Sequence, residues 1–235
     1  MLTSAKQKND PKRLTRRLLS AANLVREGRI VADVGCDHGK LSAFLLQSEK
    51  TPFVYATDIR PLPLEKARKL LAEQGLEDKC CCLLTDGLDG VPGDQVEDVV
   101  IAGIGADVTM HIISHTPWLY QRDKHLVLVP ASKRERVRRF LASQGFDTEQ
   151  EEAVRDGKHC YSVISAYYTG TVKKLSVREA WLGKIDITTP DGEEYLRLVR
   201  ERMNEILTAV LDPDNEHRIE AERFMEETDD YSGRT

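Results

Sequence analysis

The segment from Asp33 to Gly39, with the letters DVGCDHG, constrains the fold of this chain more than any other. It follows the apolar run Ile30–Ala32 and precedes a run with helical spacing that contains Leu41 and Leu45. A glycine-bearing turn from a strand into a helix presents backbone N–H groups and the positive end of the helix dipole at one point, which is how doubly wound α/β folds hold nucleotide-like ligands. We therefore expect the turn to bind such a ligand through Asp33, Gly35, Cys36 and Gly39.

The turn departs from the dinucleotide-binding fingerprint, and the departure indicates a different ligand. The pattern G-x-G-x-x-G needs glycines at positions 35, 37 and 40, whereas this chain has Gly35, Asp37 and Lys40. The Asp37 carboxylate would repel a pyrophosphate. S-adenosylmethionine has no phosphate and carries an ammonium group, so the sequence favours it as the cofactor, with Asp33 facing the ammonium directly or through water. Alternatively, Asp33 caps the following helix.

Strand-like apolar runs alternate with helix-like runs, which is the pattern of a parallel sheet covered by helices on both faces. The expected strands are Ile30–Gly35, Phe53–Asp58, Cys80–Leu84, Asp98–Ala102 and His125–Val129. The expected helices between them are His38–Gln47, Leu62–Gln74, Asp107–Ser114 and Ser132–Gln144. Two further strands, Thr148–Val154 and Cys160–Tyr168, form an antiparallel hairpin. We predict a Rossmann-like α/β fold with seven strands, in the version that methyltransferases use.

Helical patterns flank this core on both sides. Apolar residues from Leu14 to Val25 recur at helical spacing before the first strand, and a coiled-coil-like stripe runs from Leu196 to Val210. A second C-terminal helix is expected over residues 215–227. We predict a methyltransferase domain over residues 1–170 and a helical appendage over residues 171–235, which dimerises, clamps a substrate or packs on the core.

Composition excludes several classes of protein. No apolar stretch approaches the ~20 residues that span a membrane, and no secretory segment follows the charged start, so we expect a cytoplasmic protein. The five cysteines are odd in number and lack paired C-x-x-C spacing, which favours reduced thiols. His111 and His115 stand at i, i+4 spacing without a third ligand, so no metal is expected.

Charge is distributed unevenly along the chain. The net charge of −5 disfavours nucleic acid, but residues 1–29 carry a local charge of +6, residues 133–139 carry +4, and residues 212–235 carry −6. Such asymmetry fits a body that faces nucleic acid and an acidic tail. We expect RNA phosphates to contact Arg16, Arg17, Arg136 and Arg138. The alternative for residues 133–139 is a solvated helix face.

Acids also follow the second and third expected strands. Asp58 lies 23 residues after Gly35, where an acid commonly binds the ribose hydroxyls of a nucleotide-like ligand. Asp86 can accept a hydrogen bond from an adenine amino group, although Asp86-Gly87 is also a strong turn former. The expected cofactor contacts in this part of the chain are Asp58, Ile59, Arg60, Asp86, Gly87 and Leu88.

The fourth expected strand ends in a glycine-rich loop. Ala102 and Gly103 are expected to contact the cofactor, whereas Ile104 and Gly105 are expected to contact the substrate base. Glycine leaves room for a base to lie against the backbone beside the transferred methyl group. Close packing of a tight loop is the alternative explanation for Gly105.

Together these residues resemble the TrmK family of bacterial tRNA (adenine-22-N1)-methyltransferases. The resemblance runs from about Leu14 to Tyr167 and is carried by Asp33-x-Gly35-x-Asp37-His38-Gly39-x-Leu41, Asp58, Asp86-Gly87-Leu88 and Ile101-Ala102-Gly103-x-Gly105. It implies an S-adenosylmethionine-dependent enzyme that acts on tRNA. We also expect the protein to be a monomer or weak dimer. Adenine N1 attacks the methyl group as a neutral nucleophile, so we expect Asp37 to stabilise the charge that develops on the ring, and His38 to orient the acid or the base.

The sequence departs from the family pattern beside the expected acceptor pocket. Ala106 stands where the family has a second glycine, Ile104 replaces a methionine, and Val129-Pro130-Ala131 replaces Gln-Pro-Asn. The last of these changes lies after the fifth expected strand, beside the expected acceptor pocket, so it bears on the acceptor base more than on the cofactor. The alternatives are a methyltransferase that acts on a small molecule and a cofactor-binding RNA-interaction protein that has lost catalysis.

Overall fold

The computed structural model describes residues 14–228 of the chain. Several charged residues of the two expected terminal segments lie outside the described residues, namely Lys6, Lys8, Lys12, Arg13, Asp229 and Asp230. Within the described residues no helix has the length and apolar character needed to cross a membrane.

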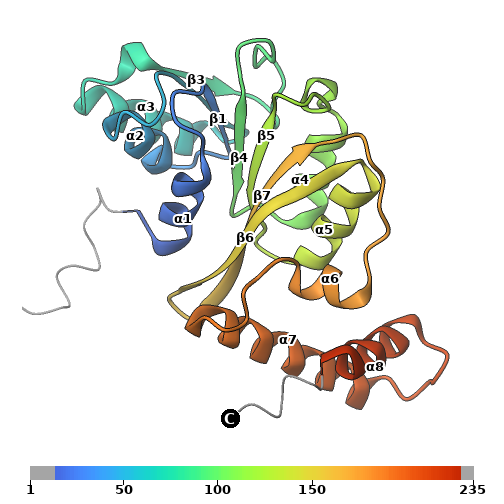
Figure 1. The fold of residues 1–235 in the computed structure, drawn as a ribbon. Coiled ribbons are helices and arrows are strands. Elements are labelled where there is room, and N and C mark those ends of the chain that lie inside the picture. The colour runs from blue at the N-terminus through green and yellow to red at the C-terminus, as the bar shows by residue number, and fades with distance from the viewer. Residues whose placement is uncertain (1–13, 229–235) are drawn as a thin grey trace, which may run out of the picture.

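One sheet organises the described residues (Figure 1). Its strands are β1 Val31–Val34, β2 Val54–Asp58, β3 Cys80–Leu84, β4 Asp98–Ala102, β5 His125–Val129, β6 Phe146–Asp156 and β7 His159–Tyr168. The helices are α1 Arg16–Leu24, α2 Lys40–Gln47, α3 Pro61–Glu73, α4 Ala106–Ser114, α5 Arg134–Ser143, α6 Val177–Leu182, α7 Pro190–Ala209 and α8 Glu216–Thr228. Two short 3₁₀ turns, η2 Glu77–Lys79 and η3 Pro117–Leu119, precede β3 and β5.

The strand order β3-β2-β1-β4-β5-β7-β6 reverses direction between β1 and β4. β1 pairs in parallel with both neighbours, so Asp33 lies opposite Ala56 of β2 and opposite Val100 of β4. In open sheets of this kind, ligands bind beyond the carboxyl ends of the strands where the order reverses. The topology therefore directs attention to the residues that follow β1, β2 and β4.

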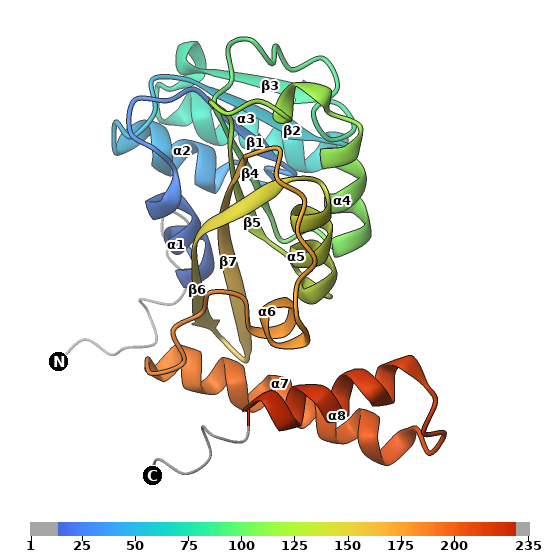
Figure 2. The same cartoon turned by 45° about the vertical axis from the view of Figure 1, so that its right-hand side comes forward.

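Apolar residues alternate between the two faces of the sheet, as the period of a strand requires. Val31 and Val54 pack in the core beneath α1, α2 and α3, whereas Ala32 and Val34 pack in the core beneath α4 and α5. Figures 1 and 2 show these helices on opposite faces of the sheet. Because β1 is buried on both faces, its end is a rigid platform for the turn that follows it.

The predicted fold class is confirmed. The sheet has seven strands within the described residues, and it ends in the expected antiparallel hairpin, β6–β7. The observed α7 and α8 cover the expected C-terminal helices. The sequence interpretation missed α6, although Ser176 and Glu179 form a capping box at its start that is readable as S-x-x-E. The boundary at residue 170 stays a prediction.

A buried ion pair joins the C-terminal helices to the sheet. Arg138 of α5 donates to Glu151 Oε1 of β6 through Nε at 2.9 Å and Nη2 at 2.6 Å, and both side chains are at most 2% exposed. The same guanidinium donates to the Ala180 carbonyl of α6 at 2.8 Å and to the Tyr195 hydroxyl of α7 at 2.9 Å. One cation thus fixes α6 and α7 against α5 and β6.

Replacing Arg138 by methionine should destabilise the protein by about 3–5 kcal/mol, because the substitution leaves Glu151 buried without its partner. The matched control is Arg136→Met, which removes an ion pair with Asp107 whose partners are 44% and 65% exposed. That change should cost no more than about 1 kcal/mol. Urea unfolding measures both free energies, and equal losses for the two variants would contradict the structural role given to Arg138.

Candidate functional site

A cleft of about 530 Å³ lies at the carboxyl ends of the parallel strands. We call it the strand-end cleft. Its lining residues come from the ends of β1 to β4 and from α1 and α4, and they include Arg17, Gly35, Asp37, Asp58, Ile59, Arg60, Asp86, Gly87, Ala102, Gly103, Ile104, Val108 and Ile112. Its size falls within the range of about 300–1,000 Å³ that small-molecule sites occupy. Much of the expected cofactor site thus converges on one cavity.

Asp33 lies outside the lining of this cleft, within the sheet layer. The residue is 3% exposed, and its carboxylate accepts a 2.6 Å hydrogen bond from the Ser42 hydroxyl of α2. Burial raises the pKa of Asp33 to about 6, although the hydrogen bonds from Ser42 oppose the shift. Through this hydrogen bond the Asp33 side chain connects the end of β1 to the first turn of α2, a role similar to the helix cap considered from the sequence. The buried carboxylate also lies behind the turn that follows β1.

Asp58 closes one end of the cleft from β2. Its carboxylate accepts hydrogen bonds from the backbone N–H groups of Arg60 at 2.9 Å and Asp37 at 3.2 Å. Burial by itself would raise the pKa of Asp58, but hydrogen bonds from Arg60 and Asp37 outweigh it and lower the pKa. The Arg60 side chain also contacts the carboxylate but is 62% exposed, so it can move aside for a ligand with hydroxyl donors.

Asp37 and His38 form a hydrogen-bonded pair at the mouth of the cleft. His38 Nδ1 lies 2.6 Å from Asp37 Oδ2, and His38 Nε2 lies 3.2 Å from Lys66 Nζ of α3. A lysine ammonium has donors and no acceptor, so Nε2 accepts and Nδ1 donates to Asp37. Asp37 also has a left-handed backbone with φ of 51°, which is uncommon outside glycine.

Glycines in the turn after β1 and in the loop after β4 fill different structural needs. Gly39 has φ of 69°, and a Cβ there would lie 2.8 Å from the Ala67 Cβ, so a side chain would push α2 away from α3. Gly103 has φ of 78° and faces open space, with no atom within 4 Å of an added Cβ. A Cβ at Gly105 would meet only the Ser132 hydroxyl at 4.0 Å, so close packing does not account for glycine at that position.

Cys36 and Leu88, both expected to contact the cofactor, are buried in the core instead. Cys36 is 6% exposed and Leu88 is 4% exposed, and neither side chain lines the cavity. Burial raises the pKa of the Cys36 thiol, and the nearby acids raise it further. Cys36 is therefore a neutral core thiol, and its backbone N–H donates to the Thr57 carbonyl at 2.9 Å to join the turn to β2.

The structure distributes the four expected RNA-binding arginines differently from the sequence interpretation. Arg138 is buried in the ion pair described above, which removes it from any exposed basic surface. The charge run at 133–139 could not reveal this, because the partner Glu151 lies on another element. Arg16 pairs with Asp191 and Arg136 pairs with Asp107. Arg17 lines the strand-end cleft.

Sequence reasoning missed several side chains that shape the site, including Val108, Ile112 and Lys66. Val108 and Ile112 of α4 line the cleft, and their i, i+4 spacing on the helix after β4 was a readable signal. Lys66 contacts His38 from α3, 28 positions away in the chain, and no local pattern could have indicated it.

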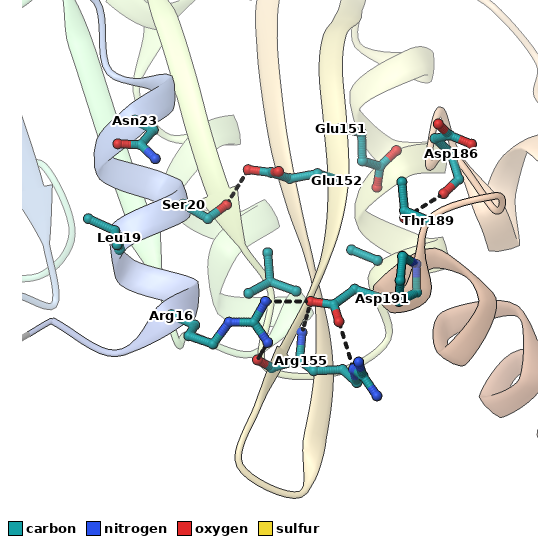
Figure 3. Close-up of a pocket in the computed structure, with 13 residues that line it drawn as sticks. Arg16, Leu19, Ser20, Asn23, Glu151, Glu152, Arg155, Asp186, Thr189 and Asp191 are labelled. Carbon is teal, nitrogen blue, oxygen red and sulfur yellow. Dashed lines mark hydrogen bonds and ion pairs between the residues drawn. The ribbon is translucent and has the colours of Figure 1, made fainter. Parts of the chain in front are cut away.

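A second cavity of about 560 Å³ lies between α1, β6 and the start of α7, and we call it the α1–β6–α7 cavity (Figure 3). Its charged side chains satisfy one another. Asp191 accepts from Arg16 at 2.9 Å and from Arg155 at 2.6 Å, and Glu152 accepts from Ser20 at 2.5 Å. Its lining residues come from α1, β6 and the segment that begins α7, and they include no residue from the ends of the parallel strands β1 to β4.

No group of three or more histidine, cysteine or acidic side chains within residues 14–228 is arranged to hold a metal ion. The rings of His111 and His115 stack with centroids 4.0 Å apart, and His115 Nδ1 lies 2.9 Å from the His111 carbonyl oxygen. Their helical spacing thus produces a ring contact on α4.

The sheet order and the acidic strand ends define a Rossmann-like methyltransferase. Residues 14–164 match the family model described as a methyltransferase domain. The tRNA (adenine(22)-N(1))-methyltransferase of Bacillus subtilis is 24% identical over 154 residues, which are 66% of this chain and 65% of that protein. A putative tRNA methyltransferase of Mycoplasma pneumoniae is 31% identical over 157 residues, which are 65% of this chain and 70% of that protein.

A solved structure extends the similarity of the fold. The crystal structure of a putative tRNA (m1A22) methyltransferase from Streptococcus pneumoniae, in complex with S-adenosyl-L-methionine, has a TM-score of 0.78 and 22% identity, and the match covers 91% of this chain and 97% of that chain. In sequence, the chain spans just under two thirds of the length of the Bacillus subtilis relative. The chain belongs to the methyltransferase-domain family.

Replacing Asp33 by asparagine should stabilise the ligand-free protein at pH 8. The folded protein binds a proton at Asp33 more readily than the unfolded chain does, so stability falls as the pH rises from 3.8 to about 6. Above that range the buried charge costs roughly 3 kcal/mol, which the variant avoids, and the gain should be smaller at pH 5.

Urea unfolding at pH 5 and pH 8 measures this difference. The matched control is Asp78→Asn, because Asp78 is exposed in η2. A gain that does not depend on pH, or a loss of stability at pH 8, would contradict the burial of an ionisable Asp33.

Proposed function

We propose that the protein transfers a methyl group from S-adenosylmethionine to N1 of an adenine in tRNA, with position 22 as the expected nucleotide. The observation that carries the proposal is the Asp37–His38 pair at the mouth of a cleft lined by the ends of β1 to β4. Similarity to the tRNA (adenine(22)-N(1))-methyltransferase of Bacillus subtilis supports the choice of donor and acceptor.

The cleft fits the donor chemically. Asp58 and Asp86 at the ends of β2 and β3 supply acceptors for ribose hydroxyls and an adenine amino group. Asp37 supplies a negative charge for the ammonium group, with the buried Asp33 behind the turn. Three carboxylates around one cavity would repel a pyrophosphate, which disfavours a dinucleotide. S-adenosylmethionine, when bound, supplies an electrophilic methyl group.

The residues around Gly103 are suited to hold the acceptor base. The open space at Gly103 lets a planar ring approach the backbone, and Ile104 provides an apolar surface. Neutral adenine N1 has an in-plane lone pair, so the reaction can begin without a general base. Alignment within the cleft can therefore supply most of the acceleration, because orientation is worth effective molarities of up to ~10⁵–10⁸ M. N1 is on the Watson–Crick edge, so a paired target must first leave its helix.

Methylation leaves the adenine ring positively charged, and Asp37 is placed to stabilise that charge. Its carboxylate is 55% exposed at the cleft mouth, and the hydrogen bond from His38 fixes one oxygen. Fixed charges aimed at a developing opposite charge lower the barrier without reorganisation. Lys66 orients His38, and His38 orients Asp37.

The RNA-binding surface lies on the methyltransferase core around this mouth. Lys40 and Lys133 are exposed at the starts of α2 and α5, beside the loops that follow β1 and β5, and Arg16 and Arg136 keep exposed guanidinium groups. Residues 190–228 hold 12 acidic and five basic residues, which disfavours phosphate contacts by α7 and α8. Tyr195, Met203, Ala221 and Phe224 of these helices are buried within the chain, which supports a monomer or weak dimer, and a tRNA substrate implies a cytoplasmic enzyme.

Transfer of a labelled methyl group from S-adenosylmethionine to bulk tRNA tests the proposal directly. Nucleoside mass spectrometry of the treated tRNA should detect N1-methyladenosine. Methyl groups found only on guanine or ribose would contradict the adenine assignment. Donor binding without transfer to any RNA would favour a small-molecule methyltransferase or a catalytically impaired RNA-interaction protein.

Asp58→Ala should weaken the binding of S-adenosylmethionine and S-adenosylhomocysteine by about 10- to 100-fold, because hydrogen bonds to a charged group are worth ~1.5–3 kcal/mol. Calorimetry measures both affinities. Asp78→Ala, which removes an exposed carboxylate outside the cleft, should leave them unchanged. Tighter binding of NAD than of either ligand would contradict the donor assignment.

Asp37→Asn should lower the rate of methyl transfer more than it lowers the affinity for donor or tRNA. The amide keeps the shape of the side chain and removes its charge, so we expect a rate lower by about 10- to 100-fold, less than the full effect of a buried charge. Single-turnover kinetics with saturating tRNA measure the rate, and Asp94→Asn in an exposed loop is the control. An unchanged rate would remove the catalytic role of Asp37 and leave the donor site intact.

A further inference from the structure

Arg17 lies at the end of the strand-end cleft that is farthest from Asp58 and Asp86. It belongs to α1, which packs against α2 and against β4 to β7, whereas Asp58 and Asp86 follow β2 and β3 on the other side of β1. The proposed nucleoside contacts therefore occupy one end of the cavity. Arg17 faces the other end, near Gly35 and Gly103.

The Arg17 guanidinium is held in place but retains hydrogen-bond donors. Its Cζ lies 4.6 Å above the ring of Tyr161 of β7, a stacking contact that limits its motion. Its buried Nε lies 3.9 Å from Asp156 Oδ2, too far for a hydrogen bond, and its terminal N–H groups make no hydrogen bond within residues 14–228. Arg60, the other arginine of the cleft lining, donates to Asp58. Arg17 is thus the cleft arginine whose donors are available to an anion.

We propose that Arg17 binds the carboxylate of the amino-acid part of the methyl donor. The inference rests on the proposed function. The amino-acid part carries an ammonium and a carboxylate on one carbon, and the cleft has acids for the first but needs a cation for the second. A guanidinium presents parallel N–H donors that match a carboxylate, and stacking on Tyr161 orients this fork before the ligand arrives.

A phosphate of the RNA substrate is the other anion that Arg17 could bind, and the sequence interpretation assigned it that role. The partly buried position of Arg17 within the cavity favours the donor carboxylate. The side chain is 30% exposed and lines the cavity, and its stacking partner comes from β7. Phosphate contacts would instead be expected on the more exposed side chains, such as Arg16 at 63%.

Calorimetry with two ligands tests the assignment. One is S-adenosylhomocysteine, and the other is 5′-S-(3-aminopropyl)-5′-thioadenosine, which keeps the ammonium and lacks the carboxylate. Arg17→Met should weaken the binding of S-adenosylhomocysteine by about 10- to 100-fold and leave the affinity for the analogue unchanged. The difference in affinity between the two ligands should therefore largely disappear. Arg17→Lys should retain part of the difference in affinity between the two ligands. Arg122→Met removes an exposed arginine outside the cleft and should change neither affinity.

The comparison of ligands separates the alternatives. Equal weakening of both ligands would overturn the proposal, because it would indicate that Arg17 only supports α1. Unchanged affinity for both ligands together with weaker tRNA binding would overturn it in favour of the RNA phosphate. If the wild-type protein bound neither S-adenosylmethionine nor S-adenosylhomocysteine, the proposed function itself would fail, which is a distinguishable result.

Discussion

The pairing of β1 with both β2 and β4 is the constraint on which the site depends. Because the three strands are parallel, their carboxyl ends lie at one edge of the sheet, and residues from separate parts of the chain meet there. Backbone hydrogen bonds then extend the order past the strands, as from Cys36 to the Thr57 carbonyl and from Asp37 to Asp58. The position of Asp37, on which the proposed chemistry rests, follows from these contacts.

The buried charged side chains of Arg138 and Asp33 have different roles in this protein. Arg138 is fully satisfied by Glu151 and by partners on α6 and α7, so its burial joins the C-terminal helices to the core. Asp33 has a single side-chain partner, Ser42, and burial raises its pKa to about 6, so its charge costs stability near neutral pH. The ionised Asp33 carboxylate destabilises the ligand-free protein. A bound ligand with an ammonium group nearby would stabilise that ionised form, as expected for an acid at a ligand site.

The order of elements and the strand ends could be predicted because their signals are local. Short apolar runs between helix-like segments identified the strands, and the turn at Gly35 identified the ligand edge. The burial of Arg138 in an ion pair could not be predicted, because its partners Glu151 and Tyr195 lie 13 and 57 positions away in the sequence. The position of Arg17 likewise depends on Tyr161 from β7, which a basic helical pattern cannot reveal.

The account depends most on which of two similar cavities receives the donor. A crystal structure of the protein with S-adenosylhomocysteine answers this directly. We predict the ligand in the strand-end cleft, with its adenosine toward Asp58 and Asp86 and its amino-acid end toward Asp37 and Arg17. A ligand bound in the α1–β6–α7 cavity, or in the strand-end cleft with its adenosine at Arg17, would contradict the account.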